Sequence, residues 1–379
     1  MSPHQPQSLS DLVSTKRAII CCGAGGVGKT TTSASLAVAA ARQGRRVLVL
    51  TIDPSKRLAE TLGVSQNSPE PTALTVERSQ AAGISPPGLL HAWMLDPKRV
   101  SDESVRSFAR DNGALETLLH NRIYQQATEM VTGLHEYTAV KALHRFITEG
   151  VYDLVVLDTP PSRNALDFLD APSRFAGFFD TGVFKLFLPK KAPGLLGRAA
   201  GRLVNRVLGS VFGDEFANEM SAFLGSFASL FGALNADFKE IRHFLTTEHV
   251  SFLLITSQSD AALAEAHFFH DKIVTLSYPF AGFILNRSSA RIEKEFPRPA
   301  IIPPNATAAL KSAIEKLKWV ARIEHLQAER DRGVLADLGL RGGSHAFAIP
   351  LPEMPEGASD VATLSAMADL ILQERRSGR

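Results

Sequence analysis

Short apolar runs bounded by turn residues recur along the 379-residue chain, with helical patterns between them. The runs are rich in Val, Ile, Leu and Phe and hardly alternate with polar residues, as expected of strands covered on both faces. Alternating strands and helices predict an α/β fold with a doubly wound, mostly parallel sheet whose ligands bind at the carboxyl ends of the strands. The predicted strands are Arg17–Cys22, Arg46–Thr51, Leu90–Leu95, Tyr152–Leu157, Ser251–Thr256, Phe280–Leu285 and Ala346–Pro350, and the predicted helices include Ser33–Arg42, Asp260–Val274 and Ala358–Gln373.

The region 172–245 interrupts this alternation, because it has no good strand and holds more than half of the chain's phenylalanines. Five of its apolar residues recur at a spacing of three or four, which predicts one face of a helix. That face is either the core of a helical lobe or a surface for an apolar partner. Its members are Phe216, Met220, Phe223, Phe227 and Phe231.

Composition and charge leave the class of protein broad. Hydrophobic residues make up 45% of the chain and the net charge is +2, which is ordinary for a globular protein and gives no reason to expect nucleic-acid binding. Cys21 and Cys22 are adjacent in the first predicted strand and cannot pair without severe distortion. With no disulfide framework, signal peptide or membrane-spanning run in the sequence, we expect a cytoplasmic protein.

A glycine-rich loop lies between the first predicted strand and an Ala-rich helical stretch. Its pattern, a glycine, four residues and then Gly-Lys-Thr, is that of a P-loop. Glycines let backbone N–H groups point at phosphate oxygens, and the following helix presents its positive end to the same anion. Lys29 is predicted to reach the β- and γ-phosphates of ATP, and the Thr30 hydroxyl to ligate Mg²⁺. The predicted nucleotide-binding residues here are Gly23, Gly25, Gly26, Val27, Gly28, Lys29, Thr30 and Thr31.

Two aspartates follow predicted strands at the same edge of the sheet. Asp53 comes just after Arg46–Thr51 and is a candidate to orient the attacking water, so it is assigned with Lys29 to the catalytic residues. Its alternative role is to open a turn before Pro54. Asp158 follows Tyr152–Leu157, where P-loop ATPases carry a second Mg²⁺ aspartate, which usually acts through water. Its alternative role is that of a turn or helix N-cap residue.

Several ordered motifs together resemble the ArsA-like family of arsenite-pump and tail-anchored-protein-targeting ATPases, within the MinD/ParA class of deviant P-loop proteins. The three elements that carry this resemblance most strongly are Gly23–Thr32, Asp53–Ser55 and Asp158–Leu166. Four further segments are similar to family elements in the same order along the chain. They are His91–Pro97, Gly133–Glu136, Phe283–Arg287 and Pro350–Glu353.

The resemblance implies an ATPase that works as a dimer with ATP at the interface. It implies that Asn286, with Arg287, contacts the base, and that the loop containing Pro350 and Leu351 closes over it. It also implies that the Phe-rich helices form a groove for a hydrophobic client, as in targeting and chaperone members. We therefore divide the chain into a flexible N-terminus (1–16), a P-loop ATPase domain (17–171 and 246–379) and an inserted helical subdomain (172–245).

The chain departs from the family pattern in ways that leave alternatives open. Ala24 stands where the family has a signature lysine that reaches the partner's phosphates, so hydrolysis by a homodimer is expected to be slow. Lys56, Arg57 or Arg163 could supply the charge, or a Lys-bearing paralogue could complete a heterodimer. The basic stretch 195–208 suggests a second alternative, a MinD/ParA-like positioning ATPase peripheral to a membrane. The lack of other cysteines argues against a metalloid-pump motor.

Overall fold

The computed structural model describes residues 8–52, 57–64, 68, 70–96, 134–160, 210, 213, 215, 219–220, 236–237, 239–291, 306–354 and 361–373. The chain divides into two compact units. The first comprises residues 1–94, 150–162 and 248–379, and the second comprises residues 95–149 and 163–247.

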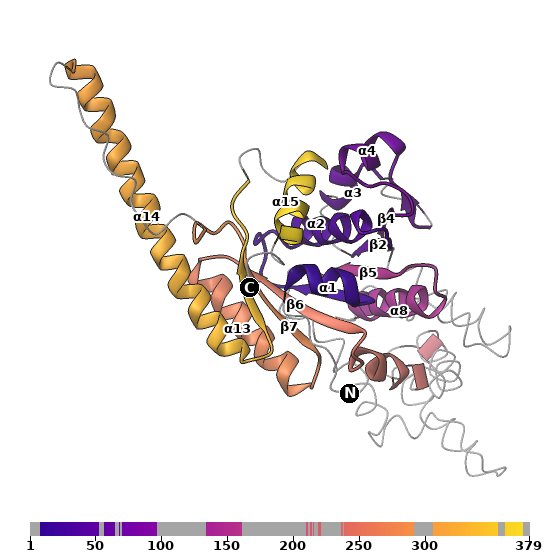
Figure 1. Ribbon diagram of the computed structural model, residues 1–379. Coiled ribbons are helices and arrows are strands. Elements are labelled where there is room, and N and C mark those ends of the chain that lie inside the picture. The colour runs from indigo at the N-terminus through magenta and orange to yellow at the C-terminus, as the bar shows by residue number, and fades with distance from the viewer. Residues whose placement is uncertain are drawn as a thin grey trace, which may run out of the picture. The chain divides into compact units, whose positions relative to one another are not determined.

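The first unit is built on an eight-stranded sheet with the order β3-β4-β2-β5-β1-β6-β7-β8 (Figure 1). Neighbouring strands run parallel, except that β3 pairs antiparallel with β4 at one edge. The structure therefore confirms the predicted α/β fold with a mostly parallel, doubly wound sheet. The strands are β1 (Ala18–Cys22), β2 (Arg46–Thr51), β3 (Thr72–Ala73), β4 (Leu89–Met94), β5 (Leu154–Asp158), β6 (Val250–Thr256), β7 (Phe280–Leu285) and β8 (Phe347–Pro350).

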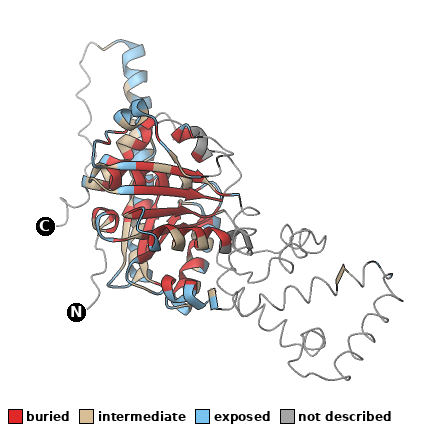
Figure 2. Cartoon of the chain, turned by 90° about the vertical axis from the view of Figure 1, so that its right-hand side faces the viewer, coloured by how far each residue is buried: buried red, intermediate tan, exposed pale blue. Residues whose placement is uncertain are grey.

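The central strands are buried along their whole length, because helices cover both faces of the sheet (Figure 2). The chain moves from β1 towards β2 in one direction and from β6 towards β8 in the other, and right-handed crossovers then place their helices on opposite faces. On one face α2 (Lys29–Arg42) packs with α1 (Leu9–Thr15) and α15 (Val361–Gln373). On the other, α13 (Asp260–Thr275) and α14 (Ala308–Gly342) pack against β6, β7 and β8.

The expected flexible N-terminus is wrong for residues 8–15, which form and cap α1. The Ser8 side chain accepts a hydrogen bond from the Asp11 N–H at 3.1 Å, so it supplies the N-cap. Leu9, Leu12 and Val13 share one helical face and are fully buried. This short amphipathic helix was not predicted from the sequence, because the polar residues on its opposite face make the first residues polar on average.

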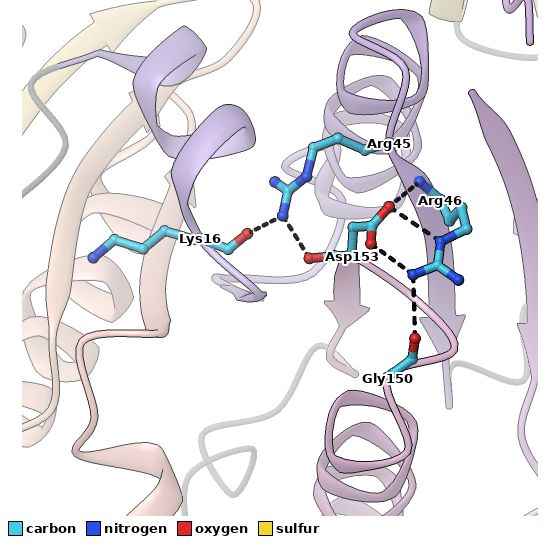
Figure 3. A network of polar contacts seen from close by, with 5 residues as sticks. All are labelled: Lys16, Arg45, Arg46, Gly150 and Asp153. Atoms are coloured by element: carbon cyan, nitrogen blue, oxygen red, sulfur yellow. Dashed lines mark hydrogen bonds and ion pairs between the residues drawn. The ribbon is translucent and has the colours of Figure 1, made fainter. Parts of the chain in front are cut away.

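A network of arginines joins α1 to the amino-terminal ends of two strands (Figure 3). The Arg45 guanidinium donates to the main-chain carbonyls of Lys16, at 2.7 Å, and of Val13 and Asp153. Arg46 donates to both carboxylate oxygens of Asp153, with an Nη2–Oδ1 distance of 2.8 Å. These bonds lie at the amino-terminal ends of the strands, opposite the glycine-rich loop, and stabilise the fold there.

Within the described residues, five helices, one of them α1, and one strand were not among the predicted elements. Two are the short helices α3 (Arg57–Leu62) and α4 (Val76–Ala81), and β3 has only two residues. The largest is α14, a helix of 35 residues. Thr307 caps its start, and Gly343 ends it with a left-handed φ of 75°. α14 has only Ala328, Asp331 and Leu338 fully covered, so its apolar pattern is weak.

The second unit is described only in part. It contains α8 (Leu134–Thr148), whose Lys141 forms an ion pair with Asp237 at 2.9 Å. Residues 95–149 belong to this unit, whereas we had expected them in the ATPase domain. Of the five residues of the Phe-rich face only Met220, which is half-buried, falls within the described ranges. The other four, and the basic stretch 195–208, lie outside them, so the inserted subdomain stays a prediction.

No helix in the described part of the chain is both long enough and apolar enough to cross a membrane.

Candidate nucleotide site

The glycine-rich loop joins the end of β1 to the start of α2, the strand–loop–helix context that the sequence predicts. Gly23 has a φ of 152°, and a Cβ there would lie 2.0 Å from the carbonyl oxygen of Ile255. Gly28 is the N-cap of α2 with a left-handed φ of 89°, and its Cβ would lie 2.2 Å from Nδ2 of Asn286. Both positions therefore require glycine, for close packing as well as for backbone conformation.

The Lys29 side chain is buried within the loop that its own backbone forms. Its ammonium donates hydrogen bonds to the carbonyl oxygens of Gly23, at 2.8 Å, and of Ala24, at 2.7 Å. A buried cation beside the amino-terminal end of α2 provides the positive charge and N–H donors that a phosphate group needs. The Lys29 ammonium thus lies at the glycine-rich loop, and its contact with phosphate stays a prediction.

Asp158 meets two hydroxyl groups at the carboxyl edge of the sheet. Its Oδ2 accepts a hydrogen bond from Thr30 Oγ1 at 2.7 Å and another from Thr51 Oγ1 at 3.1 Å. The parallel register explains the meeting, because Asp158 pairs with Thr51 of β2 and with Cys21 of β1. A fully buried carboxylate beside a threonine hydroxyl is a suitable pair of oxygen ligands for Mg²⁺.

Thr51 was not among the predicted site residues. It is the last residue of β2 and is buried. A hydroxyl residue at the end of an apolar strand, in front of the Asp53 motif, was the signal in the sequence that pointed to it.

The end of β7 contacts the glycine-rich loop on its other side. Asn286 is buried and its Nδ2 donates to the carbonyl oxygen of Val27 at 2.8 Å. A pocket open to solvent lies beside this contact. Its wall is formed by Gly28, Thr31, Asn286, Arg287, Pro352, Glu353, Met354 and Met367.

The loop after β8 borders this pocket with Pro352 and Glu353, from the segment that the resemblance singled out, and with Met354. Leu351 is fully buried and bridges two strand ends, since its N–H donates to Leu285 O and its carbonyl accepts from the Ser288 N–H. Pro350 ends β8. The pocket wall comes from Pro352, Glu353 and Met354 instead, and from Met367 of α15, which no motif singled out.

Some predicted residues lie outside the described ranges. Asp53 and Lys56 come two and five residues after the end of β2, and Arg163 comes five residues after Asp158. Their roles stay predictions, as does the role of the Arg57 side chain.

Both cysteines lie in β1, directly before the glycine-rich loop, and are fully buried. Burial raises the pKa of the Cys22 thiol to about 12 and also raises the pKa of Cys21. These are the only cysteines in the chain, and their burial disfavours the thiolate form that a soft metalloid would bind.

A glycine-rich loop, a buried lysine and a threonine–aspartate pair at the carboxyl edge of a parallel sheet define the class of P-loop nucleotide-binding α/β proteins. The model of the anion-transporting ATPase family matches residues 16–287. This range is most of the chain, so the chain belongs to the anion-transporting (ArsA) ATPase family, as the motifs indicated.

Similarity to individual relatives supports this membership. The chain is 31% identical over 160 residues to ATPase ASNA1 homolog 1 of Paramecium tetraurelia (42% of this chain, 44% of the relative). It is 29% identical over 171 residues to ATPase GET3 of Malassezia globosa (45% and 47%). It is 27% identical over 161 residues to putative arsenical pump-driving ATPase 1 of Aquifex aeolicus (41% and 38%). The match spans less than half the length of each of these relatives.

Proposed function

We propose that this chain binds ATP with Mg²⁺ at the P-loop and hydrolyses it. The observation that carries the proposal is the 2.7 Å contact between Thr30 Oγ1 and Asp158 Oδ2, beside the buried Lys29 ammonium. Lys29 and Thr30 begin α2, whereas Asp158 ends β5, and 128 residues separate Thr30 from Asp158. Their meeting at one edge of the sheet supports a single site for a nucleotide and its metal ion.

The residues present fit both groups. Glycines at 23 and 28 leave no room for a side chain and let the backbone surround an anion, while Thr30 and Asp158 would hold Mg²⁺. When bound, Mg²⁺ neutralises phosphate charge. Lys29 would exchange its bonds to the Gly23 and Ala24 carbonyls for phosphate oxygens, and we assign the orientation of the attacking water to Asp53.

We propose further that the chain works as a dimeric switch. A relative named GET3 and one named an ASNA1 homolog support a targeting or chaperone type of function. In this proposal the nucleotide state controls the inserted helices at 172–245. Their apolar face, with Phe216, Phe223 and Phe227, would bind a hydrophobic protein client in the cytoplasm.

Ala24 suggests that turnover by a homodimer is slow. The residue is buried within the loop, and its carbonyl accepts a hydrogen bond from Lys29. No cation at this position is available to enter a partner's site. A heterodimer with a Lys-bearing relative is therefore the second form that the proposal allows.

Steady-state phosphate release by the purified chain tests the proposed activity. We expect Mg²⁺-dependent ATP turnover that Lys29→Ala abolishes. The matched control is Lys311→Ala, which removes an exposed lysine from α14 and should leave turnover unchanged. Equal turnover by wild type and Lys29→Ala would show that the activity comes from a contaminant or from another site.

Light scattering and peptide binding test the switch. We expect the chain to dimerise with an ATP analogue and to bind a fluorescent transmembrane-helix peptide in one nucleotide state only. Phe223→Asp should remove peptide binding without changing ATP turnover per site. Peptide binding that is absent in every nucleotide state would refute the client role while leaving the ATPase proposal intact.

A further inference from the structure

Asp331 is a buried carboxylate on α14, a helix whose other charged residues are all at least partly exposed in the structure. Its exposed fraction is 3%. Its Oδ2 accepts hydrogen bonds from the Ser289 N–H at 2.7 Å, from Ser288 Oγ at 3.0 Å and from Gln258 Nε2 at 3.3 Å. Burying a carboxylate is costly unless donors surround it, so this arrangement needs a reason beyond helix packing.

Two of the three donors to Asp331, Ser288 and Ser289, belong to the loop that follows β7, whereas Gln258 follows β6. Gln258 also contacts the loop after β7 directly, because its Nε2 donates to the carbonyl oxygen of Arg287. Ser288 is fixed on its other side by the hydrogen bond from its N–H to Leu351 O at 2.8 Å. The loop is therefore bonded at three consecutive residues, 287 to 289.

This loop presents Asn286 and Arg287 to the pocket beside Gly28. Arg287 has a left-handed φ of 55°. A residue with a Cβ adopts that conformation only where surrounding bonds hold it. The contact of Gln258 with the Arg287 carbonyl and those of Asp331 with the next two residues supply that restraint.

We propose that Asp331 is a positioning residue for the nucleotide pocket. It acts through Ser288, Ser289 and Gln258, and it fixes the backbone from which Arg287 and Asn286 reach the bound nucleotide. The inference rests on the proposed nucleotide site. It has a consequence for α14, because a carboxylate of that helix holds the loop that lines the pocket, so we expect a displacement of the helix to change nucleotide affinity.

Isothermal titration of the full chain with Mg·ADP tests this assignment. We expect Asp331→Ala to weaken ADP binding about tenfold, the loss expected for a displaced polar contact to a charged ligand. Asp331→Asn keeps an acceptor oxygen where Oδ2 lies and should recover most of the affinity. Ser288→Ala should fall between the wild type and Asp331→Ala, since it removes only one of the three donors.

The matched control is Leu338→Ala, which removes a fully covered side chain from the same helix two turns further on. It should lower the melting temperature as Asp331→Ala does, yet leave ADP affinity unchanged. Asp331→Ala that binds ADP as tightly as Leu338→Ala does would overturn the inference and leave the nucleotide site standing. A wild-type chain that binds no ADP would instead refute the proposed function.

Discussion

The side-chain amide of Asn286 donates a hydrogen bond to the main-chain carbonyl of Val27 at 2.8 Å, although 259 residues separate the two. The contact joins the end of β7 to the glycine-rich loop. It also leaves Nδ2 of Asn286 only 2.2 Å from the place where a Cβ on Gly28 would stand. The conformation of the loop and the position of Asn286 therefore depend on each other.

Gly28→Ala should destabilise the protein through both effects. The left-handed φ alone costs about 1 to 2 kcal/mol for a residue with a Cβ, and displacement of Asn286 adds to it. Urea unfolding measures the loss. In the double variant with Asn286→Ala the contact disappears and only the φ cost remains, so the two substitutions should be less damaging together than their sum. Strict additivity would show that the two side chains do not compete for this space.

Asp158→Asn should remove the effect of Mg²⁺ on nucleotide binding. Asparagine keeps an oxygen that accepts from the Thr30 and Thr51 hydroxyls, but it lacks the negative charge that favours a divalent cation. Titrations with ADP in the presence and absence of Mg²⁺ separate metal-free binding from the gain in affinity that the metal ion confers. We expect the gain in affinity that Mg²⁺ confers to fall about tenfold or more, with metal-free binding nearly unchanged. A gain equal to that of the wild type would place the metal elsewhere.

Ala24→Lys should raise ATP turnover if the chain forms a homodimer. The new side chain would supply the cation that crosses to a partner's phosphates, and an added cation of this kind raises the rate by at least about tenfold. The control is Ala24→Met, which has a similar stem without charge. Turnover that rises equally in both variants, or in neither, would show that the missing charge at position 24 does not limit hydrolysis.

Asp153→Asn should destabilise the protein at neutral pH but not in acid. The hydrogen bonds from Arg46 hold the pKa of the Asp153 carboxyl below its ordinary value of 3.8. A lowered pKa in the folded state contributes stability that is present above 3.8 and is lost as pH falls through the folded value. Unfolding midpoints of wild type and variant should therefore differ at pH 7 and converge as the pH falls below the lowered pKa of the folded state, which buffered urea titrations measure. A difference that persists in strong acid would indicate lost packing rather than lost charge.

Cys21 and Cys22 should be unreactive in the folded protein. With the pKa of Cys22 raised to about 12 by burial, and that of Cys21 raised as well, little thiolate exists at pH 8. Reaction with a thiol reagent such as dithiobis(nitrobenzoate) should be at least about a hundredfold slower than for free cysteine. Both thiols should react at once in about 6 M guanidinium, because this concentration unfolds a domain of this kind completely. Fast labelling of the native chain would reopen the possibility of thiol ligation.

The sequence predicted the central sheet well because its strands are covered on both faces. Continuous apolar runs mark such strands, and β1, β2, β5, β6 and β7 each lie within a residue or two of the predicted range. The glycine-rich loop and Asp158 were found for the same reason, since each follows directly on a buried run. The edge strand β3 has two residues and no such pattern, so only its pairing with β4 reveals it.

The interactions that the sequence did not predict are those between distant segments. Thr51 meets Asp158 through the strand register, and Asp331 meets Ser288 because α14 packs along β7 and β8. The sequence did carry an indication that Asp331 is buried, since this residue lies on one helical stripe with Ala328, Leu335 and Leu338. A lone acid on an apolar stripe indicates a buried polar contact, but its partner becomes known only from the fold.

Equilibrium binding of a non-hydrolysable ATP analogue tests the central claim most directly. Calorimetry with Mg²⁺ and the β,γ-imido analogue should give one site per chain for the wild type, and Lys29→Ala should weaken binding by about a hundredfold because a buried charge-assisted contact to phosphate is lost. Circular dichroism should show that the variant is folded. Equal affinity of wild type and Lys29→Ala, or no binding by a folded wild type at millimolar analogue, would contradict the account.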